Sequence, residues 1–473
     1  MTHPYYLHRR TLLQHLMLHG ATGSGKTALV LIPMLEQLIN LASRHEDSSI
    51  VVLDLKGDPA FFHSMRIAAK RRGLRFRWFT TKLRHSTFGF NPFLQRHFKR
   101  DMTKNQAAEM YAKAFGLDFG NLYGASYFRD LAVLVLRALL ELPEIDSFAK
   151  LSLYAKKHPD FFDLPKKAAE QTTHLHASLD ALATIEPLNV TPDTTSEAIC
   201  NNAIDVSDVF EEPQVLYFYL PSTLEDLISF TTSKLFGYLL LTAASMRPPK
   251  QRKKVFFCVD EFQRIVSQDF AVFVQQARAF DIGCILATQT TADLYSAGDD
   301  FAEVLEENTG TKIDLTGIGK RQSERLIEQS PDGIRLLKSF SDKGPSEQEQ
   351  VVKSLTYDEL THITAHAGRG LVRTAMPYGL TQCGGRQVRF SADFHIPASE
   401  YQRRLHATWP AEIDNPGTLT VTGTPPGAGR SASESPSGEA SETQSAPSQQ
   451  KSLIKRVAAR ILRDQPQVTQ SEE

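Results

Sequence analysis

The stretch from Gly20 to Thr27 reads GATGSGKT and fits the pattern GxxxxGK[ST]. In this pattern glycines let backbone N–H groups close on phosphate oxygens, the lysine reaches the β- and γ-phosphates, and the last hydroxyl binds Mg²⁺. The required context of strand, loop and helix is present, because residues 15–19 read as a short apolar strand and a helix follows to about residue 41. A plain glycine-rich turn is the alternative. The motif predicts that the phosphates contact Gly20, Ala21, Thr22, Gly23, Ser24, Gly25, Lys26 and Thr27.

Strands and helices alternate from this loop onward, which predicts an α/β fold. Residues 49–53 form an apolar run rich in valine and isoleucine, typical of a parallel strand buried on both faces. A helix is predicted from Pro59 to about Arg72 and another strand over 74–79. Residues 100–200 then show helical periodicity only, after which strands and helices alternate again. Further strands are predicted over 213–221, 253–260, 283–290, 311–317 and 368–374.

This organisation predicts an all-α domain inserted into one α/β domain. The expected boundaries are 1–91 and 206–410 for the two parts of the α/β domain and 92–205 for the insertion. Residues 411–473 should be a disordered tail, because their serine-, glycine- and proline-rich composition buries too little apolar surface to fold. A short basic amphipathic helix is expected at 451–463, where it could contact an acidic membrane or a partner or simply fray.

Composition favours a soluble, cytoplasmic protein. The 473 residues carry a net charge of −1, and the four cysteines show no CxxC spacing, which argues against a zinc site or a disulfide framework. Cys258 and Cys284 lie in apolar runs and are expected in the core. No run of about 18 apolar residues is evident, so no transmembrane helix is expected, and any membrane contact would be peripheral.

Two acids follow the strand in KKVFFCVDEF. Asp260 is placed to hold Mg²⁺ opposite Thr27, and Glu261 to polarise the attacking water as general base. A pair of acids on a surface turn is the alternative. The next strand, CILATQT, ends in Gln289, which is predicted to contact the γ-phosphate or the water. Because no NKxD guanine-specifying motif occurs, ATP with Mg²⁺ is the expected ligand rather than GTP.

Arg278 lies at the end of the helix that follows the acidic pair. An arginine finger must reach the nucleotide of a neighbouring subunit, so this assignment requires an oligomer. A surface salt bridge is the alternative, and Arg264 and Arg321 are weaker candidates for the finger.

Basic residues are concentrated in two stretches. Residues 60–100 contain eleven lysines or arginines and no acid, and RPPKQRKK at 247–254 contains five more. Such density favours contact with a nucleic-acid backbone over a merely solvated face. A contact of that kind is independent of sequence and suits a protein that handles any DNA, single- or double-stranded.

Taken together, GATGSGKT, DLKGD, NPF, VDEF, ILATQ and ENTGTKI resemble the TraD/TraG-type coupling ATPases of conjugative type IV secretion, within the wider FtsK–HerA group of DNA pumps. The resemblance covers roughly residues 10–375. It implies a RecA-like P-loop domain with an all-α domain, assembled as a homo-hexameric ring that uses ATP to move DNA. It also implies that residues 92–205 contact relaxosome or secretion-channel proteins.

Two points stay open. The family usually has a membrane domain before the phosphate loop, and only about 19 residues precede it here, so the chain is expected to be a soluble member, a shortened gene product or one anchored through another chain. Asp54, Lys56 and Asp58 of DLKGD could line the nucleotide or the channel, or could form a tight turn fixed by Gly57. The competing functions are a HerA-like pump on duplex DNA and a P-loop switch that is not a motor.

Overall fold

The structure is a computed structural model of the whole chain. The predicted tail, its 451–463 helix and Cys383 lie outside the part that is described. The described residues are 7–45, 47–117, 125–157, 172–194, 196, 199–200, 204–222, 226–290, 292–295, 298–316, 319–341, 344–363, 366–374, 387–393 and 395–410.

A nine-stranded sheet forms the centre of the molecule, in the order β13-β12-β9-β1-β8-β7-β2-β6-β3. All pairs from β9 to β3 are parallel, whereas β12 runs antiparallel to both of its neighbours, β9 and β13. The strands are Leu16–His19 (β1), Ser48–Asp54 (β2), Arg75–Thr80 (β3), Gln214–Tyr219 (β6), Lys254–Asp260 (β7), Ile282–Thr288 (β8), Thr311–Leu315 (β9), Arg369–Thr374 (β12) and Val388–Ser391 (β13).

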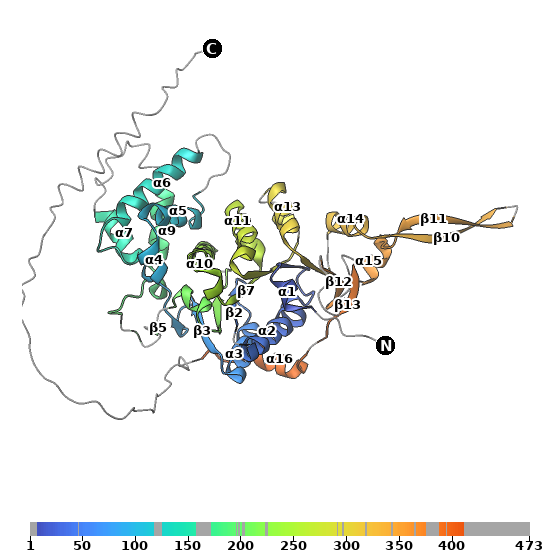
Figure 1. Cartoon of the computed structure of the whole chain (residues 1–473), viewed down its shortest axis with the longest axis horizontal. Helices are drawn as coiled ribbons and strands as arrows, with labels where there is room; N and C mark the ends of the chain where they lie inside the picture. Colours follow the sequence, from blue (N-terminus) through green and yellow to red (C-terminus); the bar gives the residue numbers. More distant parts are fainter. Residues whose placement is uncertain are drawn as a thin grey trace, which may run out of the picture.

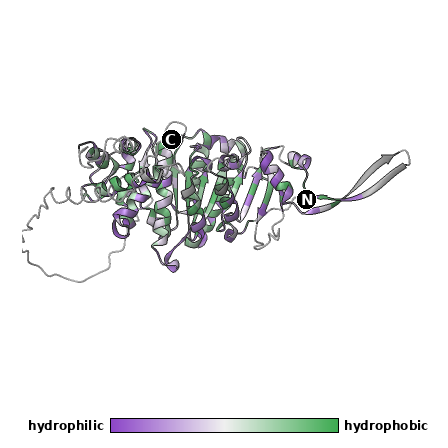
Figure 2. Ribbon diagram, turned by 90° about the horizontal axis from the view of Figure 1, so that it is seen from above, coloured by the Kyte–Doolittle hydropathy of each residue, from purple (hydrophilic) through white to green (hydrophobic). Residues whose placement is uncertain are grey.

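Helices cover both faces of this sheet, which explains why its central strands are apolar throughout (Figures 1 and 2). On one face α2, α3 and α16 pack together, and α10, α11 and α13 lie on the other. Cys258 and Cys284 are buried in β7 and β8, as expected. The helices around the sheet are Arg9–Leu12 (α1), Ile32–His45 (α2), Pro59–Arg72 (α3), Asp226–Ser245 (α10), Gln268–Ala277 (α11), Ala292–Tyr295 (α12), Asp299–Asn308 (α13), Lys320–Glu328 (α14), Tyr357–Ile363 (α15) and Ala398–Leu405 (α16).

A group of helices lies beyond the β3 end of the sheet (Figure 1). These helices are Arg96–Asp101 (α4), Lys104–Ala114 (α5), Ala125–Leu140 (α6), Phe148–Lys157 (α7) and Thr173–Ala183 (α9). They fall within the segment predicted to be helical. A two-residue strand, Ile199–Cys200 (β5), pairs with Thr87–Phe88 (β4) near the end of this segment. A ladder of two residues is too short to leave a period-two pattern in the sequence, which is why it was not predicted.

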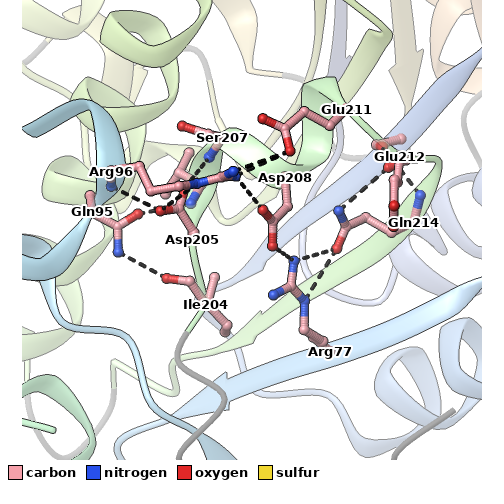
Figure 3. A network of polar contacts seen from close by, with 12 residues as sticks. Arg77, Gln95, Arg96, Ile204, Asp205, Ser207, Asp208, Glu211, Glu212 and Gln214 are labelled. Carbon is pink, nitrogen blue, oxygen red and sulfur yellow. Dashed lines mark hydrogen bonds and ion pairs between the residues drawn. The ribbon is translucent and has the colours of Figure 1, made fainter. Parts of the chain in front are cut away.

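The side chain of Gln95 joins the two ends of this helical segment. Its amide nitrogen donates to the carbonyl oxygen of Ile204 at 2.8 Å, and its amide oxygen accepts from the backbone nitrogen of Val206 at 2.8 Å. Gln95 is buried, so both bonds form away from water. The chain leaving the sheet and the chain returning to it are therefore held side by side (Figure 3).

Asp208 lies between two arginines at the same junction (Figure 3). Arg77 of β3 is 1% exposed and donates to Asp208 Oδ2 at 2.8 Å, and to Gln214 through Nε and Nη2. Arg96 at the start of α4 donates to Asp208 Oδ1 at 2.5 Å. Burial lowers the pKa of Arg77 and the nearby Asp208 carboxylate opposes that shift. Asp208 is thus the charged partner of an arginine that the core would otherwise disfavour.

Asp208→Ala is expected to lower the free energy of unfolding by about 3–5 kcal/mol, because it leaves the buried Arg77 guanidinium without its carboxylate. Urea or thermal unfolding of the purified protein measures the loss. Arg96→Ala is the control: its side chain is 45% exposed, and losing an exposed partner should cost less than about 1 kcal/mol. Equal losses in the two variants would contradict the assignment.

One feature of the fold differs from expectation. A long antiparallel hairpin, Asp332–Ser341 (β10) paired with Gly344–Lys353 (β11), projects from the body beyond α14 and was not predicted (Figures 1 and 2). Among the described helices, α10 is the one that is long and apolar enough to cross a membrane, by length and composition alone. Of its apolar window, 67% is buried within the protein.

Candidate functional site

The predicted phosphate loop connects β1 to a π-helical turn, Lys26–Leu31, that continues into α2. Gly23 and Gly25 have φ angles of 82° and 92°, which side chains rarely adopt, and a Cβ on Gly25 would lie 2.6 Å from the Leu29 side chain. The Lys26 ammonium donates to the carbonyl oxygens of Gly20 at 2.5 Å and Ala21 at 3.4 Å. The loop therefore closes around the lysine, with its glycines where the backbone requires them.

Thr27 and Asp260, which are 233 residues apart, meet beside this loop. The Thr27 hydroxyl donates to Asp260 Oδ2 at 2.9 Å. Asp260 is the last residue of β7 and is fully buried. Burial and the neighbouring Glu261 raise the pKa of Asp260 to about 6, while the Thr27 hydrogen bond and the nearby Lys56 and Lys26 oppose this rise. A hydroxyl beside a buried carboxylate is an oxygen donor set of the kind Mg²⁺ prefers.

Glu261 follows directly and has a φ of 61°, in the left-handed region. This backbone conformation is uncommon for a residue with a side chain and is typical of functional sites. Glu261 Oε2 accepts from the amide of Gln289 at 2.7 Å and also from Gln263. The amide oxygen of Gln289 accepts from the Thr22 hydroxyl at 3.3 Å. The predicted base, the strand-end glutamine and the phosphate loop thus form one connected set.

DLKGD forms a tight turn at the end of β2. Asp54 accepts backbone N–H bonds from Lys56, Gly57 and Asp58 at 2.8–3.1 Å, and a 2.7 Å bond from the Tyr217 hydroxyl. Burial, then the charges of Asp260 and Asp58, raise the pKa of Asp54 to about 8, opposed by the Tyr217 bond. The structure therefore favours the turn interpretation for the acidic residues of this motif.

The other polar residues and the glycine of the DLKGD turn have separate roles. Asp58 caps the N-terminus of α3 by accepting from the backbone of Ala60 and Phe61, and Gly57 has a φ of 72°. Lys56 is different, because its side chain is 52% exposed. The positive charge of Lys56 contributes to the lowered pKa of Lys26 and opposes the raised pKa of Asp260, so Lys56 lies on the same side of the sheet as the phosphate loop and the acidic pair.

Arg278 lies near the amino ends of the parallel strands, whereas the phosphate loop, the acidic pair and Gln289 lie at their carboxyl ends. It is exposed, follows α11 and precedes the amino end of β8. It therefore lies apart from the phosphate loop and the acidic pair of its own chain. The weaker candidates have local contacts: Arg264 lies 3.9 Å from Asp226, and Arg321 lies over the Tyr295 ring at 3.6 Å.

Several lysines and arginines of the two basic stretches form hydrogen bonds and ion pairs within the fold. Arg77 and Arg96 belong to the junction described above, and Arg247 pairs with Glu211. In the second basic stretch, Lys254 pairs with Asp47 at 3.2 Å. These side chains are committed to intramolecular contacts, so a nucleic-acid surface has to be built from others.

A buried pair next to the loop was missed from the sequence. His19, the last residue of β1, lies 3.0 Å from Asp314 of β9 through its Nδ1, and Gln322 of α14 donates to the same carboxylate at 3.0 Å. The parallel register sets His19 directly opposite Asp314. The only signal was a polar residue at the end of each apolar run, which does not reveal which strands are neighbours.

No family model and no curated protein matches the sequence. The fold is similar to solved structures of the bacterial conjugative coupling protein TrwB. The unbound TrwBdeltaN70 structure has a TM-score of 0.58 and 13% identity over 82% of this chain and 86% of that chain. TrwB with the ATP analogue ADPNP has a TM-score of 0.56 and 14% identity, covering 82% and 87%. TrwB with ADP and Mg²⁺ has a TM-score of 0.55 and 13% identity, covering the same shares.

At this identity the similarity establishes the fold. The α/β fold predicted from the sequence is confirmed, and its similarity to the fold of the coupling protein TrwB agrees with the resemblance seen in the sequence.

Proposed function

We propose that this chain is a P-loop ATPase that hydrolyses ATP to move DNA, in the manner of a conjugative coupling protein. The observation that carries the proposal is the assembly of Thr27, Asp260, Glu261 and Gln289 at one phosphate loop, although Thr27 is more than 230 residues from the others. The fold is similar to that of TrwB, which its solved structures describe as a plasmid coupling protein, and this similarity supports the proposed class of function.

ATP and Mg²⁺ are the proposed ligands, as in the TrwB complexes with ADP and Mg²⁺ and with an ATP analogue. The residues fit these groups: the glycine-rich loop leads directly into the start of a helix, where backbone N–H groups favour phosphate, and a hydroxyl meets a buried carboxylate beside it. Thr27 and Asp260 would hold Mg²⁺, and Lys26 would bind the terminal phosphates. Mg²⁺ would neutralise phosphate charge when bound.

In the proposed reaction, Glu261 accepts a proton from the attacking water. Gln289 hydrogen-bonds to both Glu261 and Thr22, and so keeps the general base in position relative to the phosphate loop. Arg278 of a neighbouring copy supplies positive charge where negative charge develops on the phosphate. The copies form a ring, for which we propose six, and the ring surrounds DNA. Residues 92–205 form the proposed contact with transfer partners, on the cytoplasmic side of the membrane.

Lys26→Ala is expected to abolish ATP binding or turnover, because the variant loses the ammonium that the loop encloses. A fluorescent ATP analogue measures binding, and phosphate release measures turnover. Lys56→Ala is a useful comparison, since it removes a half-exposed lysine from the same edge and should have a smaller effect. ATP binding and turnover at wild-type rates in Lys26→Ala would contradict the site.

Steady-state ATP hydrolysis without DNA, with single-stranded DNA and with duplex DNA tests the proposed function, with Glu261→Gln as the blank. Strong stimulation by DNA supports a motor. Stimulation by duplex alone favours a HerA-like pump over a coupling protein. Slow hydrolysis that neither DNA changes, in a tethered hexamer as well as in the free chain, would identify a P-loop switch instead.

A further inference from the structure

A short loop after β3 carries an exposed leucine between two exposed cations. Residues 81–85, here called the Leu83 loop, contain Lys82, Leu83 and Arg84 in succession. Leu83 is 83% exposed, more than any other large apolar side chain in the described part of the chain. Neither Lys82 nor Arg84 forms an ion pair with any described residue. These three exposed side chains, one apolar and two cationic, therefore do not stabilise the described fold.

The loop is held in one shape at its base. The indole nitrogens of Trp78 and Trp409 both donate to the carbonyl oxygen of Ser86, at 2.8 and 3.0 Å, and the Ser86 hydroxyl donates to Pro410 at 2.6 Å. Within the loop, the backbone nitrogen of His85 donates to the carbonyl oxygen of Lys82 at 3.3 Å. A contact made by a fixed loop loses less conformational entropy on binding than one made by a mobile loop.

The register of the sheet places this loop on the same edge as the nucleotide site. Thr80 is paired with Tyr219, Tyr219 with Asp54, and Asp54 with Asp260, so these four residues form one row across adjacent strands. Three strand spacings separate the ends of the row, about 14 Å at about 4.8 Å each. The Leu83 loop begins one residue beyond that row, close enough for changes at Asp260 and Glu261 to act on it through two intervening strands.

We propose that the Leu83 loop is a DNA contact, in which Lys82 and Arg84 bind phosphates and Leu83 lies against a base. This rests on the proposed function and names a surface for its DNA. Two cations that flank an apolar tip match the alternation of charged backbone and apolar base faces along a strand. Leucine is among the side chains that proteins insert between bases. The absence of acidic residues from 60 to 100 removes local repulsion of phosphate.

The test compares binding of a labelled oligonucleotide and its duplex to the full chain with ATP, by fluorescence anisotropy over a range of salt. Lys82→Ala/Arg84→Ala should raise Kd at least about ten-fold at about 0.1 M salt and reduce the salt slope by at least about 1. Leu83→Ser should raise Kd with the salt slope unchanged, because the contact it removes is apolar. Arg10→Ala/Arg44→Ala, an equal change of charge in exposed residues of α1 and α2 outside both basic stretches, should leave Kd unchanged.

Thermal unfolding is measured first, and midpoints equal to wild type show that these exposed substitutions leave the fold intact. Wild-type DNA binding by the Lys82→Ala/Arg84→Ala variant would overturn the proposal. The proposal would also be overturned if this variant lost binding to phosphatidylglycerol vesicles but kept its DNA binding, because the loop would then be a lipid contact. If the wild-type chain binds neither form of DNA, the proposed function fails as well, so the two failures are distinguishable.

Discussion

Glu261→Gln is expected to lower the rate of ATP hydrolysis about 10²–10⁴-fold while ATP binding is retained. Glutamine has nearly the same shape and can still hydrogen-bond to Gln289, but it cannot take a proton from water. The variant should therefore accumulate with ATP bound. Single-turnover hydrolysis measures the chemical step, and a fluorescent ATP analogue measures binding.

Gln263→Ala is the matched control for this variant. Gln263 donates to the same carboxylate oxygen as Gln289 but forms no hydrogen bond to the phosphate loop among the described residues. Its loss should reduce turnover less than ten-fold, an amount expected for one supporting hydrogen bond. Turnover in Glu261→Gln within a few fold of wild type would show that another group is the base.

Arg278→Ala is expected to reduce turnover about 10³-fold or more, with ATP affinity nearly unchanged. The reason is position: Arg278 lies at the amino edge of the sheet, away from the phosphate loop of its own chain. In the proposed ring it would act on the nucleotide of another copy, in the transition state. Arg264→Ala, which removes an exposed arginine near Glu261, should change turnover much less.

Mixing Arg278→Ala with Glu261→Gln tests the same assignment more sharply. Each variant alone should hydrolyse ATP very slowly, whereas a mixed ring would contain some sites with Glu261 from one copy and Arg278 from its neighbour. Recovery of hydrolysis on mixing supports a shared site. Loss of ATP binding in Arg278→Ala, or unchanged turnover, would remove the intersubunit role.

The parts of the fold that follow from local sequence were predictable. The helix from Pro59 to Arg72 was expected at its observed bounds, because Asp58 and Pro59 favour its start and Gly73, with a φ of 66°, favours its end. The strand ending in Asp260 was evident from its continuous apolar run. A phosphate loop and a strand-end acid pair also predicted which distant residues would meet, because parallel strands end at one edge of a sheet.

The missed parts depend on contacts that local patterns do not specify. The hairpin of β10 and β11 has a polar second strand, GPSEQEQVVK, so no period-two pattern marks it. His19 and Asp314 meet only because β1 lies between β8 and β9. Arg77 was counted with a basic surface, yet it is buried against Asp208, since charge density along the sequence does not report burial.

ATP-driven displacement of streptavidin from biotinylated DNA tests the central claim most directly. The wild-type chain is mixed with single-stranded or duplex DNA carrying biotin at one end, and release of streptavidin is followed with ATP, with ADPNP and with Glu261→Gln. The proposed motor predicts release that requires hydrolysable ATP and Glu261. DNA-stimulated hydrolysis without release from either end of either DNA would contradict translocation.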